Sequence, residues 1–339
     1  MRFLPLLFAV SAALAQPQLD FLNHGRPVLD AHNCYPYDGR WADRIDRALA
    51  SGFPVSIEQD IAWANGRPVV THTSKTTGAE PTLREYFFER VRPIVEQALK
   101  KNDRASWPIL ILHFDFKSLE PETLRGVWQL LGEYESWITT APQTSDPHVV
   151  APLDRKPILA ITEDADIQEQ IFFRDLKPGE RLRVFGSAQT GAIEAKSREE
   201  RAHLLATLPP ERLLPDPPTN FRRWWNNSWF EVEEGGQTRA GDWTPADGAR
   251  LGALVARAHR LGYWIRFYTL DGFSESENRG WDQGYNFGSL DAVKLRWNAA
   301  LDAGVDFIAT DQYEDLAALI RSRARQHVAA DHPRHQRDK

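Results

Sequence analysis

Short apolar runs alternate with longer amphipathic stretches along most of the chain. The runs are apolar at nearly every position and end in polar turns, a pattern typical of strands that are buried on both faces. We therefore predict strands at residues 28–32, 55–60, 69–72, 109–116, 158–162, 183–187, 263–270 and 307–310.

The longer stretches repeat their apolar positions at helical spacing. They predict helices at residues 41–51, 82–101, 121–134, 198–206, 245–261, 290–303 and 314–325. One of these helices has clear end signals, because Thr244 suits the N-cap, Pro245 the first helical position and Gly262 the residue after the end.

These strand and helix units follow one another along the 339-residue chain without a Gly- or Ser-rich linker. This alternation favours an α/β fold, a single (β/α)8 TIM-type barrel, over a doubly wound sheet. We expect the sixth strand in the irregular stretch 216–241, together with an enlarged loop. The sequence has neither a Gly-x-Gly-x-x-Gly motif at a strand-to-helix turn nor a P-loop, so nucleotide-binding α/β folds lose support.

The two ends of the chain differ from its body. Residues 1–15 combine an early arginine, an apolar run and a finish in small residues, which is typical of a secretory signal peptide. We therefore expect a secreted or periplasmic protein, with the barrel at 16–320 and a basic, flexible tail at 321–339. Cys34 is the only cysteine, so we expect the fold to rely on its core rather than on an intramolecular disulfide.

Charge narrows the range of partners. The formal net charge is −6, and the basic tail means that the body is more acidic still. An acidic body argues against binding to nucleic acid, where rows of Lys and Arg are expected. No apolar run beyond the N-terminus is long enough to span a bilayer. We expect a small-molecule substrate, no nucleic-acid partner and no stable membrane insertion, and the oligomeric state stays open.

Barrels of this type carry their chemistry where the strands end, so the polar residues that close the apolar runs matter most. These residues are His32, Asn33, Glu58, Asp60, His72, Asp115 and Lys117. Because successive side chains of a strand face opposite sides, Glu58 and Asp60 share one face. Asp115 and Lys117 share a face for the same reason. If those faces line the lumen, two histidines, three carboxylates and a lysine converge at one mouth.

This set of residues is suited to phosphodiester cleavage. Neighbouring carboxylates repel one another unless a cation compensates them, and hard oxygen ligands suit Mg²⁺ or Ca²⁺. We predict Glu58, Asp60 and Asp115 as the ligands of one divalent cation. We predict that His32 and His72 form an acid–base pair, because an unperturbed pKa of about 6.5 leaves both protonation states accessible. Lys117 is predicted to stabilise charge on the phosphoryl oxygens.

The same segments resemble the phosphatidylinositol-phospholipase-C-like phosphodiesterase superfamily, which includes glycerophosphodiester phosphodiesterases and sphingomyelinase D. DAHNCYPYDG, SIEQDIAW and PVVTHT look like the family's first His, its Glu-x-Asp metal pair and its second His. ILHFDFKS looks like its acidic-x-Lys strand, while IRFYTLDG and AGVDFIATDQYEDL resemble its seventh and eighth strands. Within the superfamily, the chain is most similar to a poorly characterised bacterial and fungal branch.

The resemblance also bears on substrate binding. Asn33 replaces an Arg that follows the first His in glycerophosphodiesterases, and this change removes a bidentate grip on phosphate. Tyr268 stands where the family commonly has a Trp. We predict Asn33, Tyr268 and Trp281 as substrate-binding residues. The expected substrate is a glycerophosphodiester or a phospholipid headgroup, and both hydrolysis and formation of a cyclic phosphate stay open.

Two other function classes compete with this interpretation. A secreted glycoside hydrolase would use a carboxylate pair, for which Glu163 and Glu231 are candidates, but it gives the two histidines no task. A non-catalytic barrel that binds lipid or carbohydrate is the other alternative. His113 shares a face with Asp115 one layer deeper, and we interpret it as a hydrogen-bonded buried histidine.

Overall fold

The computed structural model describes residues 22, 27–36, 42–177, 179–234, 242–277, 284 and 286–331. The predicted signal peptide and Trp281 lie outside the described residues. Among the described helices, none is both long enough and apolar enough to cross a membrane.

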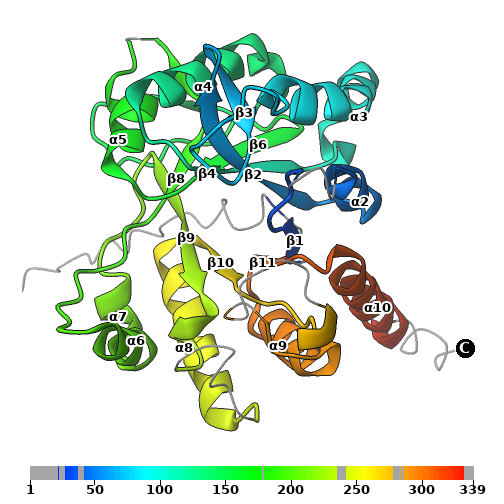
Figure 1. The fold of residues 1–339 in the computed structure, drawn as a ribbon, viewed down its shortest axis with the longest axis vertical. Coiled ribbons are helices and arrows are strands. Elements are labelled where there is room, and N and C mark those ends of the chain that lie inside the picture. The colour runs from blue at the N-terminus through cyan, green and yellow to red at the C-terminus, as the bar shows by residue number, and fades with distance from the viewer. Residues whose placement is uncertain are drawn as a thin grey trace, which may run out of the picture.

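Eight parallel strands form a closed barrel, because the first strand pairs with both the second and the last. This pairing confirms the predicted (β/α)8 fold (Figure 1). The strands are β1 Val28–Ala31, β2 Val55–Ala64, β4 Leu110–Phe116, β6 Ile158–Thr162, β8 Phe185–Ser187, β9 Arg222–Ser228, β10 Trp264–Tyr268 and β11 Phe307–Thr310. The sixth strand, β9, lies inside the irregular stretch where we expected it.

Helices cover the outside of the barrel, with α3 and α4 over one half and α8, α9 and α10 over the other (Figure 1). Their bounds are α2 Arg44–Ala50, α3 Glu89–Lys101, α4 Pro121–Glu133, α5 Asp166–Glu169, α6 Arg198–Thr207, α7 Pro210–Leu213, α8 Pro245–Leu261, α9 Leu290–Ala303 and α10 Tyr313–Asp331. The predicted start of α8 is confirmed, because Thr244 and Asp247 form a reciprocal capping box.

Several short elements differ from the prediction, among them the two-residue strands β5 Ala141–Pro142 and β7 Arg181–Leu182, which pair with each other outside the barrel sheet. The short strand β3, Arg67–Val70, runs antiparallel to β2 through an Asn65-Gly66 turn, so it forms a hairpin beside the barrel. Asn and Gly both tolerate the positive φ angles that such a turn requires. β3 ends at Val70, so His72 lies in the loop that follows. The short helices α5 and α7 were not predicted, because four residues are too few to show a helical period.

The C-terminal helix is longer than predicted. We expected a flexible tail from residue 321, but α10 continues through Asp331. The segment contains no Gly or Pro to end a helix before Asp331, and its Arg321 donates a hydrogen bond to the carbonyl of Ser51 at 2.9 Å. Residues 332–339 lie outside the described part.

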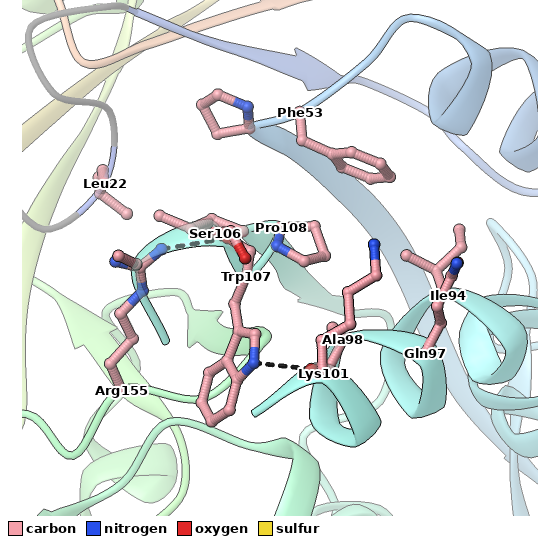
Figure 2. A pocket seen from close by; sticks show the side chains of 13 residues that line it. Leu22, Phe53, Ile94, Gln97, Ala98, Lys101, Ser106, Trp107, Pro108 and Arg155 are labelled. Carbon is pink, nitrogen blue, oxygen red and sulfur yellow. Dashed lines mark hydrogen bonds between the residues drawn. The ribbon is translucent and has the colours of Figure 1, made fainter. Parts of the chain in front are cut away.

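One pocket of about 440 Å³ lies at the barrel end where the strands begin (Figure 2). Phe53, Trp107 and Arg155 line it, each a few residues before a barrel strand. The indole Nε1 of Trp107 donates to the carbonyl of Ala98 at 2.8 Å, which ties this end to α3. The predicted polar strand ends lie at the other mouth.

Candidate functional site

The predicted carboxylates meet at the mouth formed by the C-terminal strand ends. Asp60 on β2 lies opposite Asp115 on β4 in the parallel register, and Glu58 lies opposite His113. Glu58 and Asp60 are both buried. Ligand atoms of Glu58, Asp60 and Asp115 lie within 4.8 Å of one another. We call these three residues the acidic triad, and strand alternation together with the parallel register of β2 and β4 brings them together.

Lys117 lies against the triad immediately after β4. Its Nζ is 2.7 Å from Oδ2 of Asp115 and 3.2 Å from Oδ2 of Asp60. Burial by itself would lower the pKa of Lys117, but Asp60 and Asp115 outweigh it and raise the pKa. The ammonium therefore stays charged and balances only part of the negative charge of the triad.

The triad fits a hard divalent cation. It offers carboxylate oxygens, the donors that Mg²⁺ and Ca²⁺ prefer. Oδ1 of Asp60 is buried and has no hydrogen-bond partner among the described residues. Burial and the neighbouring charge of Asp115 raise the pKa of Asp60 although His72 and Lys117 lower it, so the charge of Asp60 is only partly compensated. A bound cation would supply the rest of that compensation while sharing two of the carboxylates with Lys117.

His32 follows β1 and is almost fully buried. Its Nδ1 lies 2.9 Å from Oδ1 of Asp311, a residue that follows β11. Burial would lower the pKa of His32, but Glu58 and Asp311 raise it to about 9. Arg44 contacts both members of this pair: its guanidinium donates to Asp311 at 3.3 Å and to the carbonyl of His32 at 3.2 Å. The His32 ring is thus held in one orientation.

His72 reaches the same mouth from the loop after β3. Its Nδ1 is 2.7 Å from Oδ2 of Asp60 and 2.9 Å from the hydroxyl of Tyr35. The His72 side chain is 50% exposed, whereas that of His32 is 11% exposed. One histidine therefore lies at the floor of the site and the other at its solvent edge.

Asn33 and Tyr35 connect the two histidines. The hydroxyl of Tyr35 donates to Oδ1 of Asn33 at 2.7 Å, and the amide of Asn33 donates to Asp311 at 3.1 Å. Asn33 has a φ of 53°, a left-handed conformation that Asn tolerates better than most residues. The Asn33 side chain is thus hydrogen-bonded to Tyr35 and Asp311, and the contact of Asn33 with substrate stays a prediction.

Arg266 on β10 lies in the barrel lumen below the triad and is not among the predicted site residues. Its Nη2 lies 2.5 Å from Oε2 of Glu58, its Nε contacts Asp30, and its Nη1 lies 2.9 Å from Oδ1 of Asn226. Burial would lower the pKa of Arg266, but Asp30 and Glu58 raise it. Counting back two residues from Tyr268 places Arg266 on the lumen face, so alternation could have found it.

His113 lies in the same buried layer. Its Nε2 is 2.8 Å from Oε1 of Glu163, and Glu163 also accepts from the amide of Asn226 at 3.0 Å. The structure agrees with the interpretation of His113 as a buried, hydrogen-bonded histidine. Glu163 therefore belongs to the hydrogen-bond network of the barrel lumen.

Tyr268 closes the mouth beside His32. The guanidinium of Arg266 lies 5.3 Å from its ring centre, and the ring centres of Tyr268 and His32 are 6.4 Å apart. Tyr268 is therefore within reach of a ligand at His32, as its predicted role requires.

Comparisons with known proteins give no functional assignment. No family model matches the chain, and no curated protein matches it. Similar solved structures include two Plasmodium falciparum HPPK-DHPS variants with pteroate, both at 10% identity, with TM-scores of 0.44 and 0.46. A further HPPK-DHPS complex with substrates has 9% identity and a TM-score of 0.43.

The matches to the two pteroate complexes each cover 90% of this chain and 49% of the other chain, and the match to the complex with substrates covers 90% and 50%.

 The chain thus spans about half the length of these structures. Such distant matches say nothing about chemistry, and the fold assignment rests on the strand pairing itself.

The lumen network gives a stability prediction. Replacing Arg266 with Met leaves Asp30 and Glu58 buried without their cation, so the free energy of unfolding at pH 7 should fall by about 3–5 kcal/mol. Burial then raises the pKa of Asp30 in the folded variant above its unfolded value, so the deficit should shrink as the pH falls from 7 to 5. Urea unfolding of the variant and of the wild type at pH 7 and pH 5 measures this difference in the free energy of unfolding.

Arg260→Met is the matched control, because the exposed pair of Arg260 with Glu211 should contribute less than about 1 kcal/mol. A deficit of Arg266→Met no larger than that of the control, or one that grows at pH 5, would contradict the assigned role of Arg266.

Proposed function

We propose that the chain is a secreted, metal-dependent phosphodiesterase that uses His32 and His72 for proton transfer. One observation carries this proposal: each histidine has its Nδ1 held by a separate aspartate, His32 by Asp311 and His72 by Asp60 of the acidic triad. The motif resemblance to the phospholipase-C-like superfamily supports it, and membership of that superfamily stays a prediction.

The hydrogen bonds at Nδ1 define the proton chemistry. An aspartate that accepts from Nδ1–H fixes the tautomer, so Nε2 is the nitrogen that exchanges a proton with the substrate. One histidine takes the proton of the attacking hydroxyl as its oxygen bonds to phosphorus. The other gives a proton to the leaving oxygen as its bond to phosphorus breaks. Which histidine begins as the base stays open, as does the choice between water and a substrate hydroxyl as the attacking group.

Glu58, Asp60 and Asp115 are the residues that would hold the cation. A bound Mg²⁺ or Ca²⁺ supplies Lewis-acid stabilisation of the negative phosphoryl oxygens. Lys117 places a second positive charge at the same point, and its contacts with Asp60 and Asp115 fix its position.

The expected substrate is a neutral or zwitterionic organic phosphodiester. Lys117 contacts Asp60 and Asp115 of the triad, and Arg266 is buried against Glu58, whereas nucleic-acid grooves need rows of exposed Lys and Arg. The glycoside hydrolase alternative is less well supported, because Glu163 is engaged by His113 and Asn226. Secretion rests on residues 1–15 and stays a prediction.

The first functional prediction concerns the metal. Chelator should abolish phosphodiesterase activity, and Mg²⁺ or Ca²⁺ should restore it. Asp60→Asn removes a proposed ligand, so calorimetry should show metal affinity lowered by about tenfold or more, at least the loss typical of an outer-shell partner. Glu120→Gln, in the exposed loop before α4, is the control and should bind metal normally. Full activity in excess chelator, or unchanged metal affinity in Asp60→Asn, would refute the metal site.

The second prediction concerns the histidines. His32→Ala and His72→Ala should each lower turnover by about 10²–10⁴-fold, the usual contribution of a positioned proton-transfer group. His148→Ala, at an exposed position, should keep wild-type turnover. Circular dichroism confirms that each variant is folded. A folded variant of His32 or His72 with wild-type turnover would remove that histidine from the mechanism.

The third prediction concerns Lys117 and the substrate class. Because Lys117 would contact the phosphate rather than the attached alcohols, Lys117→Ala should lower kcat/KM for every substrate without changing their order. The measurement compares choline and ethanolamine lysophospholipids, glycerophosphodiesters and single-stranded nucleic acid at matched metal concentration. A changed order would contradict the role of Lys117, and preferential cleavage of nucleic acid would overturn the substrate class.

A further inference from the structure

The pocket at the barrel end where the strands begin has no task in the proposed chemistry. Its volume of about 440 Å³ falls in the range of small-molecule sites (Figure 2). The loops before β2, β4 and β6 and the second half of α3 line it, and we call it the remote pocket. Ile109 belongs to its lining, whereas Asp115 of the acidic triad lies about 20 Å further along β4. A ligand in the remote pocket would therefore not touch the triad.

Apolar side chains form much of the wall of the remote pocket. Phe53, Ile94, Trp107 and Pro108 all belong to its lining. Figure 2 shows Phe53 across the pocket from Trp107, and Phe53 is 39% exposed. A ligand with an apolar body would remove this apolar surface from water, which a small inorganic ion cannot do. The wall therefore favours an organic ligand.

Two cations lie among these apolar groups. Lys101 at the end of α3 and Arg155 before β6 belong to the lining, and none of its described residues is Asp or Glu. Arg155 donates to the carbonyl of Trp107 at 3.1 Å, and burial lowers the pKa of Arg155. A bound anion would stabilise the charged guanidinium by attraction and by charge-assisted hydrogen bonds. The charge of the lining therefore favours an anionic ligand.

Acidic groups near the pocket compensate part of this charge. Asp154 lies 3.2 Å from Arg104 and 3.8 Å from Arg181, so its charge is shared with cations outside the lining. Asp103 precedes the short turn before β4 and accepts from the backbone amide of Ala105 at 3.2 Å. These two carboxylates leave the pocket positive, but they reduce the surplus.

The remaining surplus suits a single negative charge. Lys156 adds a cation beside the pocket, with its Nζ 5.9 Å from the ring centre of Trp107. The last carbonyls of α3 carry partial negative charge at the same place, although that of Ala98 accepts from the indole of Trp107 at 2.8 Å. A monoanion such as a carboxylate therefore fits better than a phosphate dianion.

We propose that the remote pocket is a second binding site, which takes a small organic carboxylate with an apolar body. The carboxylate lies between Lys101 and Arg155, and the apolar body packs between Phe53 and Trp107. Arg155 suits this ligand because a planar guanidinium can donate two parallel bonds to one carboxylate. The proposal does not depend on the phosphodiesterase function, since the described lining includes neither the acidic triad nor its histidines.

The first arm of the test measures the preference for charge. Calorimetry on the full chain uses 2-naphthoate and octanoate, each compared with its neutral amide, and inorganic phosphate. At least one acid should bind about tenfold more tightly than its amide, because only the acid forms charge-assisted bonds with the two cations. Binding of neither acid, equal binding of each acid and its amide, or tighter binding of phosphate than of both acids would overturn the proposal.

The second arm locates the bound acid. Arg155→Met and Lys101→Met keep an unbranched apolar side chain and remove one charge, so acid affinity should fall about tenfold in Arg155→Met and about fivefold in Lys101→Met. Lys101 is exposed, so Lys101→Met still decides the test if Arg155→Met does not fold.

Lys156→Met is the matched control for this arm. It removes a neighbouring cation that is not part of the described lining, so acid affinity should stay within about twofold of the wild type. Unchanged acid affinity in Lys101→Met, or a loss in Lys156→Met as large as that in Lys101→Met, would overturn the assignment of the acid to the remote pocket.

Discussion

The ion pairs of Arg266 in the barrel lumen are the interaction on which the rest of the site depends. A guanidinium and two carboxylates, Asp30 and Glu58, are buried together where most barrels of this type pack branched apolar side chains. Such groups tolerate burial only when they are paired and hydrogen-bonded. Because Glu58 bonds to Arg266 with one oxygen, its other oxygen is directed toward His32, with Oε1 at 3.9 Å from Nε2. The ion pair with Arg266 in the lumen thus fixes the position of Glu58, the innermost carboxylate of the triad.

Between that layer and the mouth, each charged side chain of the site is paired with a neighbour that can carry the opposite charge. Asp311 holds the buried His32, while Asp60 holds the half-exposed His72 and shares Lys117 with Asp115. The two histidines therefore differ in solvent access although both are anchored in the same manner. This difference gives the site a closed floor and an open edge.

Strand alternation and strand ends predicted much of this arrangement from the sequence. Glu58, Asp60 and Asp115 come together because two neighbouring parallel strands carry them at adjacent levels. The partners of the histidines could not be predicted in the same way, since Asp311 is 279 residues from His32 and only closure of the barrel makes them neighbours. Arg266 is surrounded in sequence by apolar and aromatic residues, so the sequence predicts a strand there but does not show that this arginine pairs with Asp30 and Glu58. Glu231 was considered only as a catalytic acid, because sequence does not show that its carboxyl group is buried.

The most direct test of the account is anomalous diffraction from crystals soaked with Mn²⁺, a cation that accepts the same oxygen ligands as Mg²⁺. The account predicts one strong peak within about 2.0–2.6 Å of carboxylate oxygens of Glu58, Asp60 and Asp115. Lys117 should remain beside Asp115, and Arg266 should remain bonded to Asp30. A peak at another group, such as Asp30, Glu58 and His113, or the absence of any peak at the acidic triad, would contradict the central claim.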